Sequence, residues 1–181
     1  MKRLPFFWLV LLLAGCASTP PEPMITSFEE AREAVVDSDP EVRLEAVTYL
    51  GDIRREEGLP LVIDCLDDED KWVRLEATLA LRNFHSPRAI MPLRRALEDS
   101  DRDVKFSAAS ALFELGDYSG EEVLIEALES PREDFRFQAL MFLGKMRSRR
   151  AVPGIIKLLK DPSPRTRSTA AYILGLFREK S

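Results

Sequence analysis

The sequence has almost none of the side chains on which metal centres and nucleophilic active sites depend. Its 181 residues include one histidine and two cysteines, too few for most metal-ligand or Cys–His arrangements. It also lacks an excess of positive charge: 26 basic residues face 31 acidic ones, a net charge of −5, which argues against a dedicated nucleic-acid binder. It does have 45% hydrophobic and 31% charged residues, which is sufficient for a folded domain with a buried core.

An apolar run of eleven residues extends from Leu4 to Ala14, directly after Lys2 and Arg3. A transmembrane helix needs about 20 apolar residues to cross a hydrocarbon layer about 30 Å thick, so this run is too short to span it. A basic start followed by a short apolar run is typical of a secretory signal, which takes no part in the fold. We therefore predict that residues 1–15 are a signal peptide.

The run ends in Leu13-Ala14-Gly15-Cys16, which resembles the lipobox of bacterial lipoproteins. The resemblance implies that Cys16 carries lipid and begins the mature chain, and several acyl chains together anchor a protein stably. Ala17, in place of aspartate, resembles lipoproteins that are sorted to the outer membrane and face the periplasm. In a Gram-positive cell the same signal implies the outer face of the plasma membrane. The alternative is a plain signal peptide with an accidental cysteine.

Residues 17–26 contain three prolines and no apolar periodicity, which is typical of an extended tether of about 3.1 Å per residue. We expect a lipidated tether over residues 16–26 and a folded domain over 27–181. Loss of Lys2 and Arg3 with the signal lowers the basic count from 26 to 24, so the net charge becomes −7. With Cys16 lipidated, Cys65 is the sole free thiol, and no disulfide can form within the mature chain.

A repeat of 31 residues organises the remainder of the chain. In each unit, apolar residues recur at the spacing of one buried helix face, as in Val42, Ala46 and Leu50, so each unit predicts two helices. Four registers keep the interval without an insertion, one basic, one of alanine and two of leucine: Arg43, Arg74, Lys105, Arg136 and Arg167; Ala46, Ala77, Ala108, Ala139 and Ala170; Leu50, Leu81, Leu112, Leu143 and Leu174; Leu66, Leu97, Leu128 and Leu159.

Helix starts are also marked in the sequence. An additional helix is predicted to begin after Ser27, and a final first-type helix is predicted over 164–178, so we expect about nine helices. The alanine register allows neighbouring helices to approach closely. Acceptors suited to the N-cap precede the first helix of four units: Asp39, Asp70, Asp101 and Ser163.

Three successive units begin with one motif: Asp39-Pro-Glu-Val-Arg-Leu-Glu-Ala, Asp70-Lys-Trp-Val-Arg-Leu-Glu-Ala and Asp101-Arg-Asp-Val-Lys-Phe-Ser-Ala. They resemble the short HEAT-like repeats of the phycobilisome-lyase type, over about residues 28–178. The resemblance implies an all-α fold, a right-handed α-α superhelix of four to five helix pairs. The later units depart from the motif, with Arg132 and Ser163 in the aspartate register and Phe135 and Thr166 in the valine register.

The basic register has two interpretations. We favour a structural ladder, which the resemblance also implies, in which each basic side chain meets an aspartate. The alternative is a ligand-binding stripe along the solenoid. Two acidic rows are candidates for the partners in the ladder: Asp39, Asp70 and Asp101, or Asp37, Asp68, Asp99 and Asp161.

The rare side chains have structural explanations. His85 aligns with Arg54, Gly116 and Arg147 of other units, which predicts a solvated turn. Cys65 aligns with alanine and leucine positions, which predicts a small buried residue rather than a nucleophile. Hydroxylases with HEAT-like repeats use His–Glu pairs, which a single histidine cannot supply, and bilin attachment is a cytoplasmic activity. We expect no catalytic residue, no metal and no cofactor.

The predicted second helices change their charge from unit to unit, and in helix-pair solenoids such helices usually line the concave side. A banded surface can select a protein with complementary bands, while the alternative is an ordinary solvated face. The last helix adds an apolar candidate patch at Tyr172, Ile173, Leu176 and Phe177. The basic bands contain the candidate protein-binding residues: Arg88, Arg94, Arg95, Arg149, Arg150 and Lys157.

These observations predict a non-catalytic envelope lipoprotein that acts as a scaffold or adaptor for a protein partner. They indicate no nucleic-acid or small-molecule ligand. Two alternatives stay open: an enzyme related to HEAT-like hydroxylases or lyases, and a structural spacer that binds the cell wall.

Overall fold

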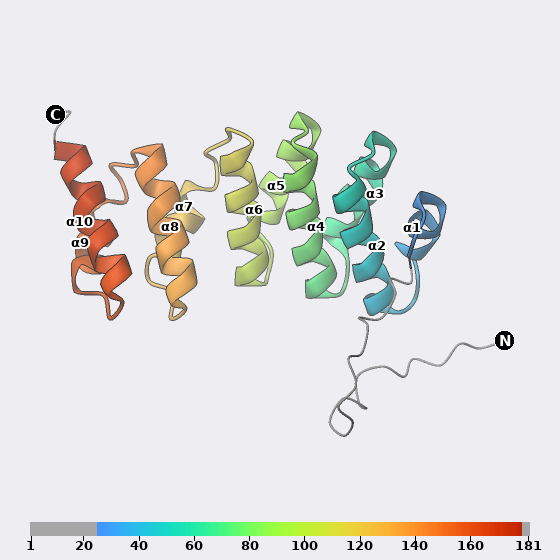
Figure 1. The fold of residues 1–181 in the computed structure, drawn as a ribbon, viewed down its shortest axis with the longest axis horizontal. Coiled ribbons are helices and arrows are strands. Elements are labelled where there is room, and N and C mark those ends of the chain that lie inside the picture. The colour runs from blue at the N-terminus through green and yellow to red at the C-terminus, as the bar shows by residue number, and fades with distance from the viewer. Residues whose placement is uncertain (1–24, 179–181) are drawn as a thin grey trace, which may run out of the picture.

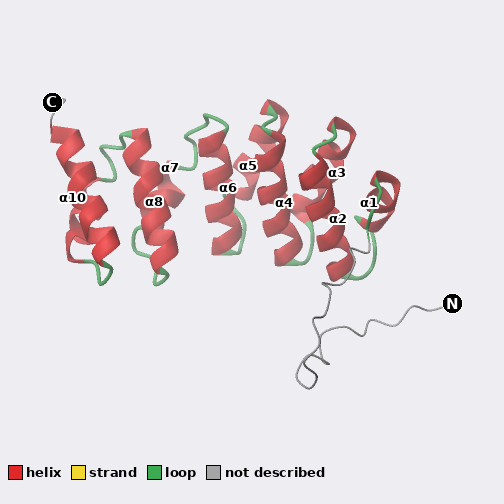
Figure 2. Cartoon of the chain, in the orientation of Figure 1, coloured by secondary structure: helices red, strands yellow, loops and turns green. Residues whose placement is uncertain are grey.

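The computed structural model describes residues 25–178, so the predicted signal peptide, Cys16 and most of the tether lie outside the described residues. The described part contains ten α-helices and four 3₁₀ helices, and no strand (Figures 1 and 2). The predicted all-α repeat fold is confirmed. The helices number ten instead of about nine, because one initial helix and one final helix flank four complete pairs.

The helices form two layers. Figure 1 shows the long first helices of successive units side by side, with the short second helices behind them. We number the units 1 to 4 by their helix pairs, α2–α3, α4–α5, α6–α7 and α8–α9. None of the described helices is long and apolar enough to cross a membrane. The bounds are α1 (Phe28–Ala34), α2 (Pro40–Ile53), α3 (Leu59–Asp64), α4 (Lys71–Phe84), α5 (Ile90–Ala96), α6 (Arg102–Glu114), α7 (Glu121–Ala127), α8 (Glu133–Met146), α9 (Val152–Lys157) and α10 (Pro164–Arg178), with 3₁₀ turns at Glu56–Gly58, Cys65–Asp67, Pro87–Ala89 and Leu158–Lys160.

Aspartate side chains cap the first helices of units 1 to 3. Asp39 accepts the backbone N–H of Glu41 at 2.9 Å, and the same bond recurs at 2.8 Å for Asp70 and 2.9 Å for Asp101. Each bond satisfies one of the free amides at a helix start. At α8 the equivalent residue is Arg132, whose side chain makes no capping hydrogen bond.

The first helices of all four units end in one backbone conformation. The positive φ angles are 51° at Arg54, 49° at His85, 78° at Gly116 and 55° at Arg147, and these residues share one register of the repeat. A left-handed residue at this point ends the helix and lets the chain turn back into the second layer. His85 therefore lies in a turn, as predicted.

Close helix contacts explain the alanine register. Its members Ala46, Ala77, Ala108, Ala139 and Ala170 are all fully buried. The α2–α4 contact is tighter still at Gly51, where an added Cβ would lie 2.6 Å from the Cβ of Ala80 and 2.9 Å from its Cα. Helices this close leave no room for a larger side chain.

The core is divided into two clusters. One extends from Ile25 to Leu112, and the other, which includes Phe106, continues to Ile173. The division falls within α6, whose residues contribute to both clusters.

Burial raises the pKa of the Cys65 thiol to about 12, and nearby carboxylates add to the effect, which supports a packing role.

The end of the predicted tether is docked on the domain. Ile25 is buried, and its backbone N–H donates to Oε1 of Glu45 at 3.1 Å. The carbonyl of Thr26 accepts the Tyr49 hydroxyl at 3.1 Å. Residues 25 and 26 of the predicted tether therefore pack on the domain, two residues before the predicted boundary at residue 27.

The close approach at Gly51 makes a testable prediction. Gly51→Ala should lower the free energy of unfolding by about 1–3 kcal/mol, because the clash is with a backbone atom that cannot move aside. Gly175→Ala in α10 is the matched control: an added Cβ meets nothing within 4 Å, so the free energy should rise by about 0.5–1 kcal/mol. Urea denaturation of both variants measures the difference, and equal effects would contradict the proposed contact.

Candidate binding surface

Three arginines of the basic register, Arg43, Arg74 and Arg136, each tie a first helix to the turn that follows the second helix of the same unit. In unit 1, Nε and Nη2 of Arg43 donate to the two carboxylate oxygens of Asp68 at 2.7 and 2.8 Å. Nη1 of Arg43 donates to the carbonyl of Asp37 at 2.8 Å. The planar guanidinium thus holds a carboxylate and a backbone carbonyl in one fixed geometry. We call this arrangement a rung.

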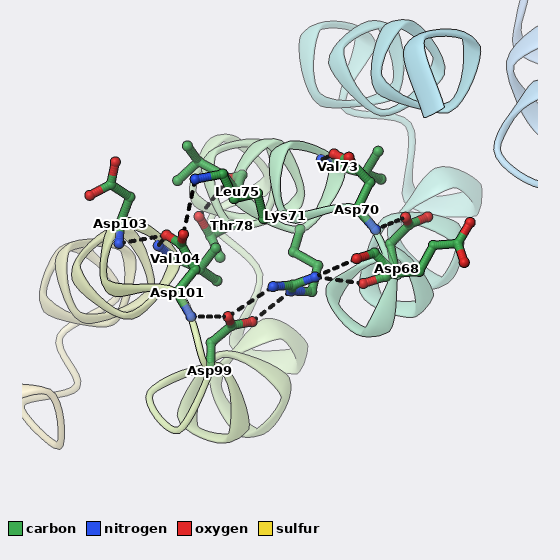
Figure 3. Close-up of polar contacts among 12 residues, drawn as sticks. Asp68, Asp70, Lys71, Val73, Leu75, Thr78, Asp99, Asp101, Asp103 and Val104 are labelled. Atoms are coloured by element: carbon green, nitrogen blue, oxygen red, sulfur yellow. Dashed lines mark hydrogen bonds and ion pairs between the residues drawn. The ribbon is translucent and has the colours of Figure 1, made fainter. Parts of the chain in front are cut away.

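Rungs recur in units 2 and 4. Arg74 binds Asp99 at 2.7 and 3.1 Å, and its Nη1 donates to the carbonyl of Asp68 at 2.8 Å. Figure 3 labels both aspartates, and dashed lines mark the polar contacts around them. Arg136 binds Asp161 at 2.7 and 3.1 Å. Arg167 of α10 keeps the carbonyl bond, to Asp161 at 2.7 Å.

The ladder uses the second of the two acidic rows. Asp39, Asp70 and Asp101 do not accept from the arginines, because their carboxylates point back to cap α2, α4 and α6. Asp101 also receives the ammonium of Lys71 at 3.2 Å. Asp68, in the second row, accepts the N–H of Asp70 at 2.8 Å as well as its arginine. One carboxylate therefore organises both the turn and the rung.

The rungs are shielded from water. The side chains of Arg43 and Asp68 are 8% and 10% exposed, and that of Asp161 is 2% exposed. For Asp161 the hydrogen bond from Arg136 outweighs burial and holds the pKa of the carboxyl below its ordinary value. These contacts favour the structural interpretation of the basic register over a ligand-binding stripe in units 1, 2 and 4.

Unit 3 has no rung. The arginine is replaced by Lys105, and the aspartate 25 residues later is replaced by Ser130. Ser130 keeps the turn, since its hydroxyl accepts the N–H of Arg132 at 3.2 Å, but it brings no negative charge. Within residues 25–178 the half-buried Lys105 side chain makes no ion pair or hydrogen bond.

A cavity of about 490 Å³ occupies the place of the missing rung, between α6, α7 and α8. Its apolar wall includes Phe106 and Phe135, whose rings stack with centroids 4.3 Å apart, and Arg132 covers the Phe135 ring at 4.0 Å. We call it the third-unit cavity. Its lining residues are Arg102, Asp103, Lys105, Phe106, Val123, Glu126, Ala127, Glu129, Ser130, Pro131, Arg132 and Phe135.

This cavity was not predicted from the sequence, although its signal is present in the repeat. Lys105, Ser130 and Phe135 each depart from their register. Three departures gathered at one junction mark a local change in the structure, which only became apparent once the partner row of the ladder was known.

Most of the candidate protein-binding residues on the second layer pair with the neighbouring unit. These pairs join successive units and, apart from Asp117, lie at least partly exposed, so the predicted charge bands partly neutralise one another. Arg95 and Arg149 make no ion pair among the described residues. The pairs are Arg88 with Glu56 at 3.7 Å, Arg94 with Asp117, Arg150 with Glu121 at 2.8 Å and with Glu122, and Lys157 with Glu129 at 2.5 Å.

The pair of Arg94 with Asp117 has a clear electrostatic consequence. Burial of Asp117 opposes ionisation, but hydrogen bonds from Arg94 and Ser119 lower the pKa of the carboxyl to about 2.

On α10, the candidate apolar patch is divided, since Ile173 is buried while Tyr172 and Leu176 are exposed.

The family model for HEAT repeats matches residues 28–113 and 121–181, which is more than half of the chain. The chain belongs to the HEAT-repeat family. The match is interrupted at 114–120, where α6 is joined to α7 in the unit that lacks a rung.

Solved structures with the same fold include protein complexes and designed binders. One is the complex of CpcE and CpcF of phycocyanin lyase from Nostoc sp. PCC7120, at 24% identity over 93% of this chain and 70% of that chain, with a TM-score of 0.68. A designed armadillo repeat protein in complex with the peptide (KR)4 is 18% identical over 83% of this chain and 81% of that chain, with a TM-score of 0.62. A search of the curated proteins found no match.

The ladder predicts that removing a basic side chain of this register lowers the free energy of unfolding only where that side chain has an aspartate partner. Arg74→Met should lower the free energy of unfolding by about 3 kcal/mol, because it leaves the carboxylate of Asp99 buried without its partner. Lys105→Met, in the same register, should change it by less than about 0.5 kcal/mol, since no ion pair is lost. Urea denaturation tests the pair, and a similar cost at both positions would refute the ladder.

The rungs also predict a pH dependence. The lowered pKa of Asp161 means that its contribution to stability is present above its ordinary pKa of 3.8 and is lost as the pH falls through the lower folded value. The difference in unfolding free energy between the wild-type protein and Arg136→Met should therefore shrink below about pH 3.8. Denaturation curves at pH 6 and below measure it. A difference that stays constant into strong acid would contradict the assignment.

Proposed function

We propose that this protein is a non-catalytic, lipid-anchored adaptor of the bacterial cell envelope that binds a protein partner through its HEAT-repeat surface. The observation that carries the proposal is the repeat fold itself, in which stacked helix pairs create an extended surface. The solved structures named above are in accord with it, since one is a complex of two proteins and another a repeat protein bound to a peptide.

Anchoring rests on the resemblance of Leu13-Ala14-Gly15-Cys16 to a lipobox. A lipid on Cys16 would keep the solenoid close to a membrane, and Ala17 favours the outer membrane facing the periplasm. The docking of Ile25 and Thr26 on the domain leaves eight residues, 17–24, between the lipid and the folded part. The surface would thus act near the membrane.

The anchor can be tested by Cys16→Ser in the natural host. The variant should leave the membrane fraction and keep an unprocessed signal, since the acylated sulfur is missing. A matched Cys65→Ser variant should fractionate with the membrane like the wild-type protein. Unchanged processing and fractionation of Cys16→Ser would contradict the lipoprotein assignment.

Partner binding can be tested by cross-linking in intact cells. Arg95→Glu and Arg149→Glu reverse exposed charges that make no ion pair among the described residues, so neither breaks an ion pair within the solenoid. If the basic bands bind, a partner cross-linked to the wild-type protein should be lost from these variants. Lys145→Glu, an equal charge change at an exposed position of α8, is the control. If all three variants capture the partner as well as the wild-type protein does, the basic bands are not the binding surface. If the wild-type protein captures no partner at all, the adaptor proposal is contradicted.

The lyase complex among the similar structures favours one alternative, an enzyme of lyase type. Among the described residues no group of three or more His, Cys, Asp or Glu is placed to hold a metal. Metal analysis of the protein purified from its host tests the related alternative, an enzyme of the hydroxylase type. Stoichiometric iron would overturn the adaptor proposal.

A further inference from the structure

We infer that the third-unit cavity binds an acidic side chain of a partner protein, with an apolar residue beside it. The inference rests on the proposed function and specifies the chemistry of the partner. It follows from the position of the cavity at the one junction, among units 1 to 4, where the ladder supplies a cation without a carboxylate.

The basic register of the repeat lacks its acidic partner in unit 3. In units 1, 2 and 4 a basic side chain reaches a carboxylate located 25 residues later in the chain. In unit 3 the cation persists as Lys105, while the residue at the position of the carboxylate is Ser130. A carboxylate brought by another chain to this position would give the Lys105 ammonium the acidic partner that the arginines of the other units already have.

The cavity is lined by six charged side chains, which differ in whether they have a partner. Several of its ionic groups are already paired: Asp103 with Arg132 at 2.9 Å, and Glu129 with Lys157 at 2.5 Å. The six charged residues of the lining sum to zero, but the groups without an ion pair among the described residues are two cations, Arg102 and Lys105, and one anion, Glu126. An anionic group gains more there than at a fully solvated position, because Lys105 is half-buried.

The cavity also has room for an apolar side chain and an apolar wall to pack it against. A cavity of about 490 Å³ is larger than one carboxylate needs, and Val123, Ala127 and Phe135 line it as well. Phe135 occupies the valine register of the repeat, and its larger ring stacks on Phe106. Such a wall would pack an apolar side chain next to the acidic one, which favours a peptide segment over an isolated carboxylate.

The packing of the solenoid explains why the cavity forms here. The two core clusters meet at α6, and α6 and α8 stand wider apart than α4 and α6 (Figure 1). The ion pair of Arg132 with Asp103 spans this junction at 2.9 Å, so the junction is held at its edge while the site of the rung stays open.

The experiment is a fluorescence anisotropy titration of the purified full chain. The probe is a labelled octapeptide of alternating aspartate and phenylalanine with blocked ends, and the control probe has lysine in place of aspartate. The acidic probe should bind and the basic one should not. Lys105→Met should weaken binding about tenfold, as expected for the loss of one charge-assisted hydrogen bond.

A second variant fills the site from within. Lys105→Arg combined with Ser130→Asp installs the pair found in the other rungs, so it should abolish binding of the acidic probe and raise the urea midpoint. Because the urea midpoint should rise while probe binding is lost, the loss of binding cannot be attributed to unfolding. Full binding by this variant, or no binding by the wild-type protein, would overturn the inference.

Two further results distinguish neighbouring explanations. If acetylaspartate amide or inorganic phosphate displaces the probe at concentrations equal to its own, the site recognises a small anion, and the peptide assignment is wrong. If cross-linking in cells captures a partner equally well with the double variant, the adaptor proposal stands and the partner binds elsewhere. Probe binding without any cross-linked partner would support the site and count against the adaptor.

Discussion

The bidentate bond between arginine and aspartate is the interaction on which the regularity of this solenoid depends. It connects the first turn of one helix to the turn that follows the second helix of the same unit, and the third nitrogen of the guanidinium holds a backbone carbonyl. The aspartate also accepts an amide of the turn that leads into the next unit. A single buried pair thereby fixes the position of a helix relative to both the preceding and the following connection.

The chain departs from this plan at one junction. Unit 3 keeps a cation and the turn but lacks the carboxylate, and the core divides at the same helix. An aromatic pair and an ion pair between Asp103 and Arg132 hold the junction together in another way. In units 1, 2 and 4 the basic side chain of this register has its carboxylate, so unit 3 is the unit in which that register holds a cation without an ion pair among the described residues.

Much of the fold could be predicted from periodicity. The alanine register, the capping aspartates and the positive-φ turn at His85 repeat local requirements, and each can be recognised without knowing what lies opposite. The choice between the two aspartate rows could not be made, because both rows carry the same charge and the same interval. It depends on which carboxylate faces the guanidinium across 25 residues of chain, and that is a property of how the pair of helices packs.

The sequence by itself determined the class of fold, the unit length, the helix ends and the structural roles of Cys65 and His85, since all of these arise from local spacing and composition. Only the tertiary structure decided which charges are already paired. The basic bands on the second layer looked like free binding surface, but Arg88, Arg94, Arg150 and Lys157 reach carboxylates of the neighbouring unit. Lys105 looked like one more member of the ladder, and the structure leaves it beside an open cavity. The physical reason is that an ion pair forms through space, so whether a charge is satisfied depends on distances that the order of residues along the chain does not state.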